Sequence, residues 1–210
     1  MSKLSNTKIR PYISLNNSKL GFSIPTVNLP YGKTCRSDAP CFKECYAHRG
    51  NMGRANFKNC VDENYATYLE NPNGYFKVIE CYLAMCPYRY FRWHSSGDIP
   101  DMQYLDLMCK LARKCKGTTF LCFTKKHEII NEYLNKHKKP INLILVLSNW
   151  GDWFCPNPHN LPTAWVELKG KICMVPNNAN ICNGYCGDCC NTNSSCWKLK
   201  KNQSVVFKQH

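Results

Sequence analysis

The sequence lacks a long hydrophobic run, an internal repeat and a low-complexity segment. Its longest apolar stretch, around Leu143 to Leu147, is far below the roughly 18 residues that a membrane span needs. The first residues, MSKLSNTKIR, contain no apolar core of a secretory signal. The usual signatures of a membrane protein, a secreted protein and a repeat array are therefore missing, and we expect a cytoplasmic protein with no membrane partner.

Acidic residues are also scarce. The 14 Asp and Glu stand against 28 Lys and Arg, which gives a formal net charge of +14. A surplus of this size repels itself unless a polyanion, an anionic ligand or a negatively charged cofactor offsets it. The composition thus indicates nucleic acid or another polyanion as a partner, although lysines on solvated helix surfaces explain part of the surplus.

Cysteine, in contrast, is abundant. The chain has 16 cysteines in 210 residues, a proportion typical of disulfide scaffolds or metal proteins. In a reducing compartment disulfides are rare, and a chain of this length builds a core without them. We therefore interpret the excess as metal ligation or thiol chemistry.

The hydrophobic pattern predicts one α/β domain over 1–210. It divides into a cysteine-containing N-terminal loop region (1–54), a body of alternating strands and helices (55–175) and a cysteine-rich tail (176–210). Short strands that alternate with helices favour parallel pairing through crossover connections. The periodicity predicts helices over 55–70 and 75–85 and around 102–112 and 129–134. It predicts strands over 20–24, 90–93, 118–123, 142–148, 164–168 and 171–175.

Three predicted strands end in unusually polar and aromatic loops, which read RWHSSGD, FTKK and SNWGDW. Functional groups of parallel α/β folds gather beyond the carboxyl ends of the strands. Candidate catalytic residues are therefore His94 as acid, base or ligand, Asp98 to orient it, and Arg92 or Lys125 to bind an anion. The alternatives are that Asp98 only caps the following helix and that His94 is a structural histidine.

The first cysteine group, Cys35, Cys41 and Cys45, lies in a polar segment interrupted by Pro40. Closely spaced cysteines in a loop hold iron–sulfur clusters, because loop backbone directs several thiolates inward. Cysteines that only pack as small hydrophobic residues are less expected in so polar a stretch.

The second group contains six cysteines and includes the Cys-x-x-Cys pair of Cys186 and Cys189, a common metal knuckle. Its members are Cys173, Cys182, Cys186, Cys189, Cys190 and Cys196. Zinc is the alternative metal here, and a thiol oxidoreductase is the least expected reading. Of the other cysteines, Cys86 and Cys155 stay undecided beside prolines, and five are expected in the core: Cys60, Cys81, Cys109, Cys115 and Cys122.

Several motifs in combination resemble a known family. They are Asn28-Leu29-Pro30, Thr34-Cys35, Cys45-Tyr46-Ala47, Arg92 to Asp98, Phe123-Thr124-Lys125 and Cys186-Gly-Asp-Cys189 with Cys196-Trp197. Together they are similar to the cysteine-rich phage proteins of the gene-product-eighty-eight-like family and, more distantly, to radical S-adenosylmethionine enzymes. This resemblance implies a small or partial TIM-like (β/α) barrel and a [4Fe-4S] cluster. S-adenosylmethionine is a further implied ligand, although the gaps of five and three residues differ from the radical enzymes' Cys-x-x-x-Cys-x-x-Cys.

We therefore expect an iron–sulfur protein of phage, viral or mobile-element type, in the host cytoplasm or the virion, and a redox or radical-type enzyme if it is catalytic. The alternative is a basic nucleic-acid-binding protein whose iron–sulfur or zinc centre is structural. The expected cluster ligands come from Cys35, Cys41, Cys45, Cys186, Cys189 and Cys196, with Cys173 and Cys182 as further metal ligands. Either one iron stays open for a ligand, or a cysteine of the tail is the fourth ligand.

Overall fold

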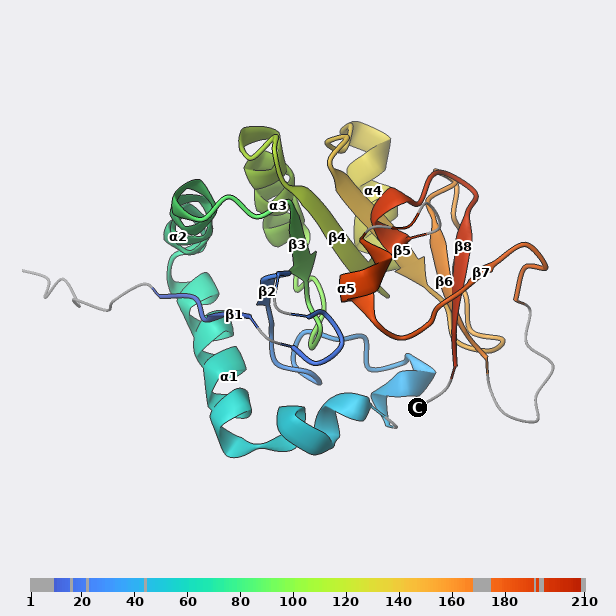
Figure 1. Ribbon diagram of the computed structural model, residues 1–210, viewed down its shortest axis with the longest axis horizontal. Coiled ribbons are helices and arrows are strands. Elements are labelled where there is room, and N and C mark those ends of the chain that lie inside the picture. The colour runs from blue at the N-terminus through green and yellow to red at the C-terminus, as the bar shows by residue number, and fades with distance from the viewer. Residues whose placement is uncertain are drawn as a thin grey trace, which may run out of the picture.

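The computed structural model describes residues 10–15, 17–21, 23–43, 45–167, 175–190, 192 and 195–208. Figure 1 shows one eight-stranded sheet with helices packed against it. The helices are α1 (Ala55–Glu70), α2 (Pro72–Met85), α3 (Met102–Lys114), α4 (His127–Lys136), α5 (Cys186–Cys189) and the short 3-10 helices η1 (Pro40–Phe42), η2 (Tyr46–His48), η3 (Gly50–Gly53) and η4 (Cys196–Lys198). The strands are β1 (Ile13–Ser14), β2 (Thr26–Val27), β3 (Tyr90–Trp93), β4 (Thr119–Thr124), β5 (Leu143–Ser148), β6 (Thr163–Glu167), β7 (Asn180–Ile181) and β8 (Ser204–Lys208). The predicted α/β class is confirmed.

The strand order is β1-β2-β3-β4-β5-β6-β8-β7. Apart from the antiparallel pair of β1 and β2, every pair is parallel. From β2 to β6 the order advances in one direction with no reversal, as in a barrel and unlike a doubly wound sheet. In the described part of the chain, however, β1 and β7 are free edges, so the sheet is open. The complete barrel is not formed.

One face of the sheet, here called the helix face, carries the larger core. Phe91, Phe120 and Leu145 lie on it and pack against residues of all four long helices, among them Tyr68, Tyr75, Met108 and Ile130. Because side chains alternate along a strand, the intervening residues point to the opposite side. When the strand order never reverses, right-handed crossovers place all helices on the same side of the parallel strands.

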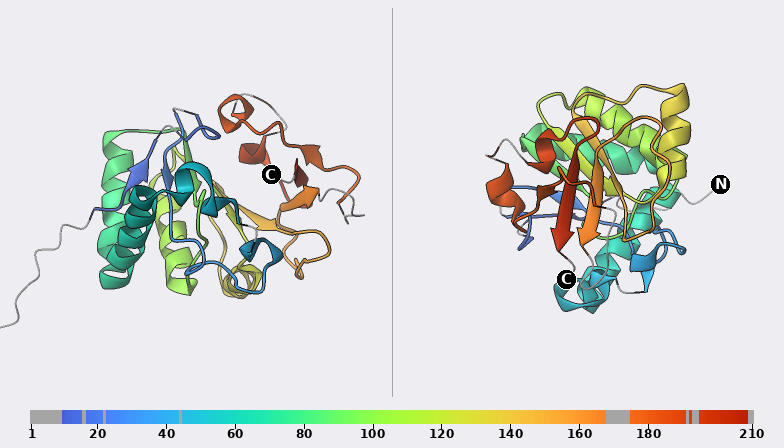
Figure 2. Two further views of the ribbon diagram at one scale, coloured as in Figure 1. Left: turned by 90° about the horizontal axis from the view of Figure 1, so that it is seen from below. Right: turned by 90° about the vertical axis from the view of Figure 1, so that its right-hand side faces the viewer.

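The opposite face, here called the tail face, is covered by the cysteine-rich tail. Leu121, Ile144 and Val146 of the sheet form a second buried cluster with Trp197 and Leu199 of the tail. Figures 1 and 2 show α5 and the segments around it on this side of the sheet, away from α3 and α4. The tail thus fills the side that would be the interior of a barrel.

Most predicted elements are present within two or three residues of their expected bounds. The predicted strand over 20–24 is wrong: its described residues form turns and an isolated bridge, and the strand follows at Thr26–Val27. The apolar side chains of Leu20 and Ile24 nevertheless explain the pattern, because both are buried against the tail face. The predicted strand over 171–175 falls almost entirely outside the described residues.

Among the cysteines expected in the core, Cys109 and Cys122 are buried, whereas Cys60 and Cys115 are only half-buried. Cys81 is exposed, so its assignment to the core is wrong. It lies on the outer side of α2, where the buried residues are Tyr75, Phe76, Ile79 and Leu83. No helix in the described ranges is long and apolar enough to cross a membrane.

Candidate functional site

The carboxyl ends of β2, β3, β4 and β5 lie at the same end of the sheet because these strands are parallel. This end, where the strands stop, is here called the carboxyl edge, as distinct from the edge strands β1 and β7. The first cysteine group follows β2 directly, in residues 28–47, here called the cysteine loop. The loop after β3 contains His94 and Asp98, and the loop after β4 begins at Lys125. The fold therefore collects the candidate residues of three separate segments at one edge.

Asn28 fastens the cysteine loop to the loop after β3. Its Oδ1 accepts hydrogen bonds from the backbone N–H groups of Ser95 and Ser96, at 2.7 and 3.1 Å. The Leu29 N–H donates to the Ser96 carbonyl oxygen at 3.0 Å. Gly97 lies so close that an added Cβ would come within 2.5 Å of the Leu29 oxygen, and its φ of +78° also favours glycine.

Asp98 connects the same two loops to the end of β4. Its carboxylate accepts hydrogen bonds from the Thr124 hydroxyl at 2.6 Å, the Ile99 N–H at 2.7 Å and the Lys125 N–H at 2.8 Å. Its own N–H donates to the Thr34 hydroxyl oxygen of the cysteine loop at 3.0 Å. Burial raises the pKa of Asp98, while these hydrogen bonds and the Lys125 charge act in the opposite direction.

Asp98 does not cap the following helix. The N-cap of α3 is Asp101, whose side chain accepts a hydrogen bond from the Tyr104 N–H at 2.8 Å. The alternative interpretation of Asp98 as a simple helix cap is therefore wrong. Its position indicates instead a buried carboxylate that joins strand-end loops.

His94 lies in the core and does not face the cysteine loop. Its Nε2 is 3.1 Å from the Tyr104 hydroxyl, and only 4% of the residue is exposed. Within the described residues the Asp98 carboxylate makes no hydrogen bond to it, so the expected orienting contact is absent. Burial, followed by the Arg92 charge, lowers the pKa of His94 to about 3. This placement corresponds to the structural histidine that the sequence left open.

The buried histidines predict a pH dependence of stability. Burial also lowers the pKa of His127 to about 4, and its Nε2 lies 3.1 Å from the Ser148 oxygen. A histidine of the unfolded chain takes up a proton near pH ~6.5, whereas the folded protein keeps both rings neutral. The free energy of unfolding is therefore highest above that pH and decreases as the pH falls toward the folded pKa. Between about pH 7.5 and about pH 5, each of the two histidines is expected to lower the free energy of unfolding by about 2 kcal/mol. Urea unfolding at both pH values measures this loss.

His94→Asn is the matched variant for this prediction. The φ of residue 94 is +52°, and asparagine is the non-glycine residue that best tolerates that conformation. The variant is expected to retain only about half of the pH dependence. An unchanged difference between the two pH values would contradict the buried neutral histidine.

The three cysteines of the cysteine loop lie close to one another. Burial, together with the charges of Asp98, Cys45 and Cys41, raises the pKa of Cys35 to about 11. Backbone hydrogen bonds from Gly32 to the Cys35 sulfur and from Ala47 to the Cys45 sulfur act in the opposite direction. Such N–H donors stabilise the thiolate, which is the form that binds metals.

Charged residues surround these thiols. Burial raises the pKa of Cys45, and the positive charge of Lys125 opposes this increase. The negative charge of Asp98 adds to the effect of burial on Cys35. Both candidate residues therefore act on the cysteine loop directly. No described acidic residue forms an ion pair with Lys125.

Arg36, next to Cys35, anchors the loop to the rest of the edge. Its guanidinium forms ion pairs with Asp38, at 2.5 Å, and with Glu128 in the first turn of α4. It also lies over the Trp153 ring, 5.2 Å from the centroid, in the loop after β5. The sulfur of Cys155, which the sequence left undecided, is 3.8 Å from Arg36 Nη1.

Tyr46 presents an aromatic ring beside Cys45. The residue is 54% exposed, yet its hydroxyl is buried and donates to the Ser95 carbonyl oxygen. Burial of this hydroxyl raises the pKa of Tyr46 to about 12. The ring is thus held by its polar end while its outer part stays accessible.

Arg92 lies between the cysteine loop and the tail. Its guanidinium stacks on the Phe123 ring of the tail face, 4.2 Å from the centroid. Burial raises the pKa of Tyr46, Cys186 and Cys196, and the Arg92 charge opposes this increase in all three. Arg92 is therefore the expected site residue that acts both on Tyr46 of the cysteine loop and on cysteines of the tail.

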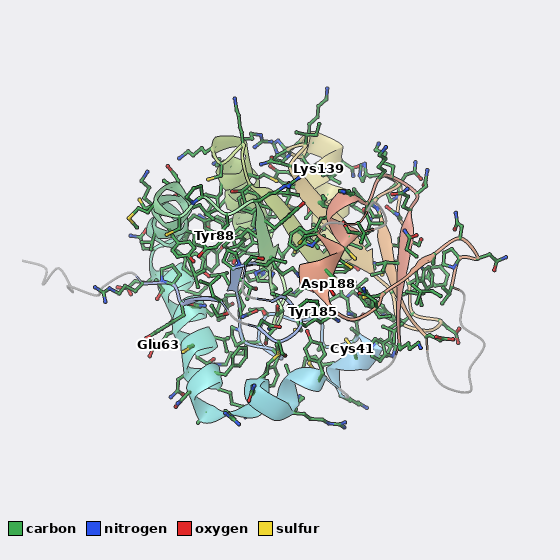
Figure 3. The ribbon with its side chains drawn as sticks, viewed as in Figure 1. Cys41, Glu63, Tyr88, Lys139, Tyr185 and Asp188 are labelled. Atoms are coloured by element: carbon green, nitrogen blue, oxygen red, sulfur yellow. The ribbon has the colours of Figure 1, made fainter. Side chains whose placement is uncertain are left out.

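The described cysteines of the second group gather in the tail, on the tail face. Cys182, Cys186, Cys190 and Cys196 pack against the buried cluster there, whereas Cys173 lies outside the described residues. Figure 3 labels Cys41 in the cysteine loop and Asp188 in α5 of the tail. In the part of the chain that the structure describes, no three His, Cys, Asp or Glu side chains already form a metal-binding group.

Some residues at this edge were not predicted as site residues. Asn28, Thr34, Thr124 and Tyr46 appeared in the sequence only as parts of family motifs. Their roles depend on contacts between segments up to 68 positions apart in the chain, which neither spacing nor periodicity reveals. The polar motif residues directly after apolar strands were the available signal.

A family model described as gene product 88 matches residues 2–207. No curated protein matches the sequence, and no solved structure matches it.

Proposed function

The chain belongs to the gene product 88 family, and from this premise we propose that it is an iron–sulfur protein whose cluster is held by Cys35, Cys41 and Cys45. The observation that carries the proposal is the position of these thiols. Three half-buried cysteines on one loop lie where the carboxyl ends of parallel strands bring Asp98 and Lys125 against them. That edge is where α/β proteins place their reactive groups.

The donor set fits a [4Fe-4S] cluster in its chemistry. Thiolates are the ligands that such clusters prefer, and hydrogen bonds to the sulfurs tune them. Gly32 and Ala47 supply such bonds to Cys35 and Cys45. The three thiols do not yet enclose a common point, so binding requires rotation of their side chains within the loop.

The surrounding residues have distinct roles in this proposal. Lys125 offsets the negative charge of the thiolates, since its charge acts on Cys45. Asp98 holds the loop in place through Thr34 and Thr124. A bound cluster supplies one-electron redox chemistry at the edge of the sheet.

We further propose that this chemistry is enzymatic and of redox or radical S-adenosylmethionine type, in a protein of viral or mobile-element origin. Three thiols leave one iron open for a ligand, and Lys125, which has no described ion-pair partner, is placed to bind an anionic group of that ligand. The reduced protein is examined by EPR with and without S-adenosylmethionine. A shifted signal supports an open iron, and an unchanged spectrum indicates an electron-transfer or structural centre.

The primary test is an anaerobic iron and sulfide count. We expect about four iron and about four acid-labile sulfide per chain, with the visible absorbance of a thiolate-bound cluster. A colourless protein without acid-labile sulfide contradicts the proposal.

A second function, binding of single-stranded nucleic acid, is favoured by the surface beside Tyr46. The exposed basic residues of the neighbouring segment form no ion pair with described residues: Lys43, Arg49, Arg54 and Lys58. A basic surface beside an accessible aromatic ring is the arrangement that binds the phosphates and stacks the bases of single strands. The logarithm of the affinity is expected to decrease linearly with the logarithm of the salt concentration. No binding at about 50 mM salt excludes this function.

A further inference from the structure

The tail brings its cysteines together from three separately anchored segments. The Cys182 N–H donates to the Val206 oxygen of β8 at 2.9 Å, and the Cys186 N–H donates to the Lys19 oxygen at 2.8 Å. Cys196 begins η4, whose Trp197 ring packs 4.9 Å from the Tyr90 ring of β3. Each segment is therefore fixed to the body of the protein, with Cys182, Cys186 and Cys196 against the buried cluster of the tail face. The described thiols do not yet enclose a common point, so metal binding requires rotation of their side chains.

The tail thiols act on one another electrostatically. Burial and the charges of Cys182, Cys186 and Cys189 together raise the pKa of Cys196 to about 12, against the opposing charge of Arg92. Burial also raises the pKa of Cys189, together with the charges of Cys186 and Cys182. The Cys189 thiol donates to Asn183 Oδ1 at 3.5 Å, directly after Cys182 in the chain.

The backbone around Cys182 has the features of a metal knuckle. Gly184 adopts a φ of +92°, a turn that favours glycine, and its N–H donates to the Cys182 sulfur at 3.4 Å. The next two cysteines, Cys186 and Cys189, form the Cys-x-x-Cys pair on α5. Hydrogen bonds to a sulfur support it as a thiolate ligand.

Cys190, whose pKa burial and the charges of Cys186 and Cys189 also raise, differs from these four in the direction of its thiol. Its thiol donates to the Cys186 backbone oxygen at 3.3 Å, so it points back along α5. It therefore provides a matched control within the same turn.

Cations that would compensate a thiolate centre are also present. Burial raises the pKa of Cys186 and Cys196; the Arg92 charge opposes this increase in both, and the Lys19 charge opposes it in Cys186. Both are held in place on aromatic rings, Arg92 on Phe123 and Lys19 on Phe207, at 4.2 and 5.0 Å. A buried charge is tolerated when opposite charges accompany it.

We propose that Cys182, Cys186, Cys189 and Cys196 form a separate, closed zinc site that fixes the tail to the tail face of the sheet. Four cysteines are the complete ligand set of a structural zinc ion. On binding, the four thiols release four protons, and the resulting double negative charge faces Arg92 and Lys19. The tail then supplies no ligand to the cysteine loop, whose cluster retains an open iron.

The test is the metal content of the full chain, purified anaerobically after zinc supplementation. We expect about one zinc per chain in the wild type and its loss in both Cys186→Ser and Cys189→Ser. Cys190→Ser is expected to keep its zinc. Retention of stoichiometric zinc in both ligand variants overturns the proposal, as does iron with acid-labile sulfide in place of zinc at these positions.

A second measurement tests the proposal even if the cysteine variants fold poorly, because it uses the wild-type protein. Cobalt(II) is added to reduced, metal-free wild-type protein, and the absorption spectrum of the bound cobalt reports tetrahedral thiolate coordination. We expect that spectrum in the wild type and in Cys41→Ala, and its absence in the wild type overturns the proposal. Since Cys41→Ala is expected to lose iron but not zinc, failure of the tail site and failure of the cysteine-loop cluster give different results.

Discussion

Cys41→Ala, purified without oxygen, is expected to contain no iron and no acid-labile sulfide. Cys41 is half-buried in η1, between two other half-buried thiols of the cysteine loop. With one of three loop ligands removed, the two remaining thiols cannot hold a cluster that the wild type binds by three. Iron and sulfide analysis together with the visible absorption spectrum measures the loss.

Cys60→Ala is the control for this experiment. Cys60 is half-buried on α1, outside both cysteine groups, and its variant is expected to keep full iron and sulfide. Cys45→Ser removes a second ligand without changing the side-chain volume much, which separates cluster loss from misfolding. Full iron in folded Cys41→Ala and Cys45→Ser protein would falsify the assignment of the cluster to this loop.

Asp98→Ala is expected to destabilise the protein by about 3 kcal/mol. The substitution leaves the Thr124 hydroxyl and two backbone N–H groups without their acceptor in a site where Asp98 is only 6% exposed. Buried donors without a partner cost the full loss of hydration. We expect the melting temperature to fall by about 10 °C, measured by circular dichroism and urea unfolding.

Asp62→Ala is the matched control, because it also removes one carboxylate. Asp62 pairs with Lys33 at 2.6 Å on the surface, where both side chains are well exposed. Exposed ion pairs contribute less than about 1 kcal/mol. If both variants lost equal stability, Asp98 would not be the buried link between the strand-end loops.

The body of the fold was predictable because its elements are long and periodic. The amphipathic pattern of α3 and the apolar run of β5 lie where the sequence indicated. The strand predicted over 20–24 is absent, and the sequence could not show this, because the apolar residues there are buried by tertiary contact with the tail and not by strand pairing. Whether the sheet closes depends on contacts between its edge strands, β1 and β7, which the local pattern does not contain.

The candidate site was predictable in part for a related reason. Parallel strands place Asp98, Lys125 and the cysteine loop at one edge, and the sequence located all three. The orientation of His94 was not predictable, because its positive φ turns the ring toward Tyr104 and the core.

The position of β8 has a consequence for synthesis on the ribosome. β8 is the last strand in the sequence, yet it pairs with β6 over five residues and is the described partner of β7. As the chain emerges, β2 to β6 can pair in order, whereas Leu121, Ile144 and Val146 lack the cover of Trp197 and Leu199 until the tail has emerged. Nascent chains that stop before Cys196 therefore expose part of an apolar sheet face and an unpaired β6 edge, the surfaces that chaperones bind and that drive aggregation.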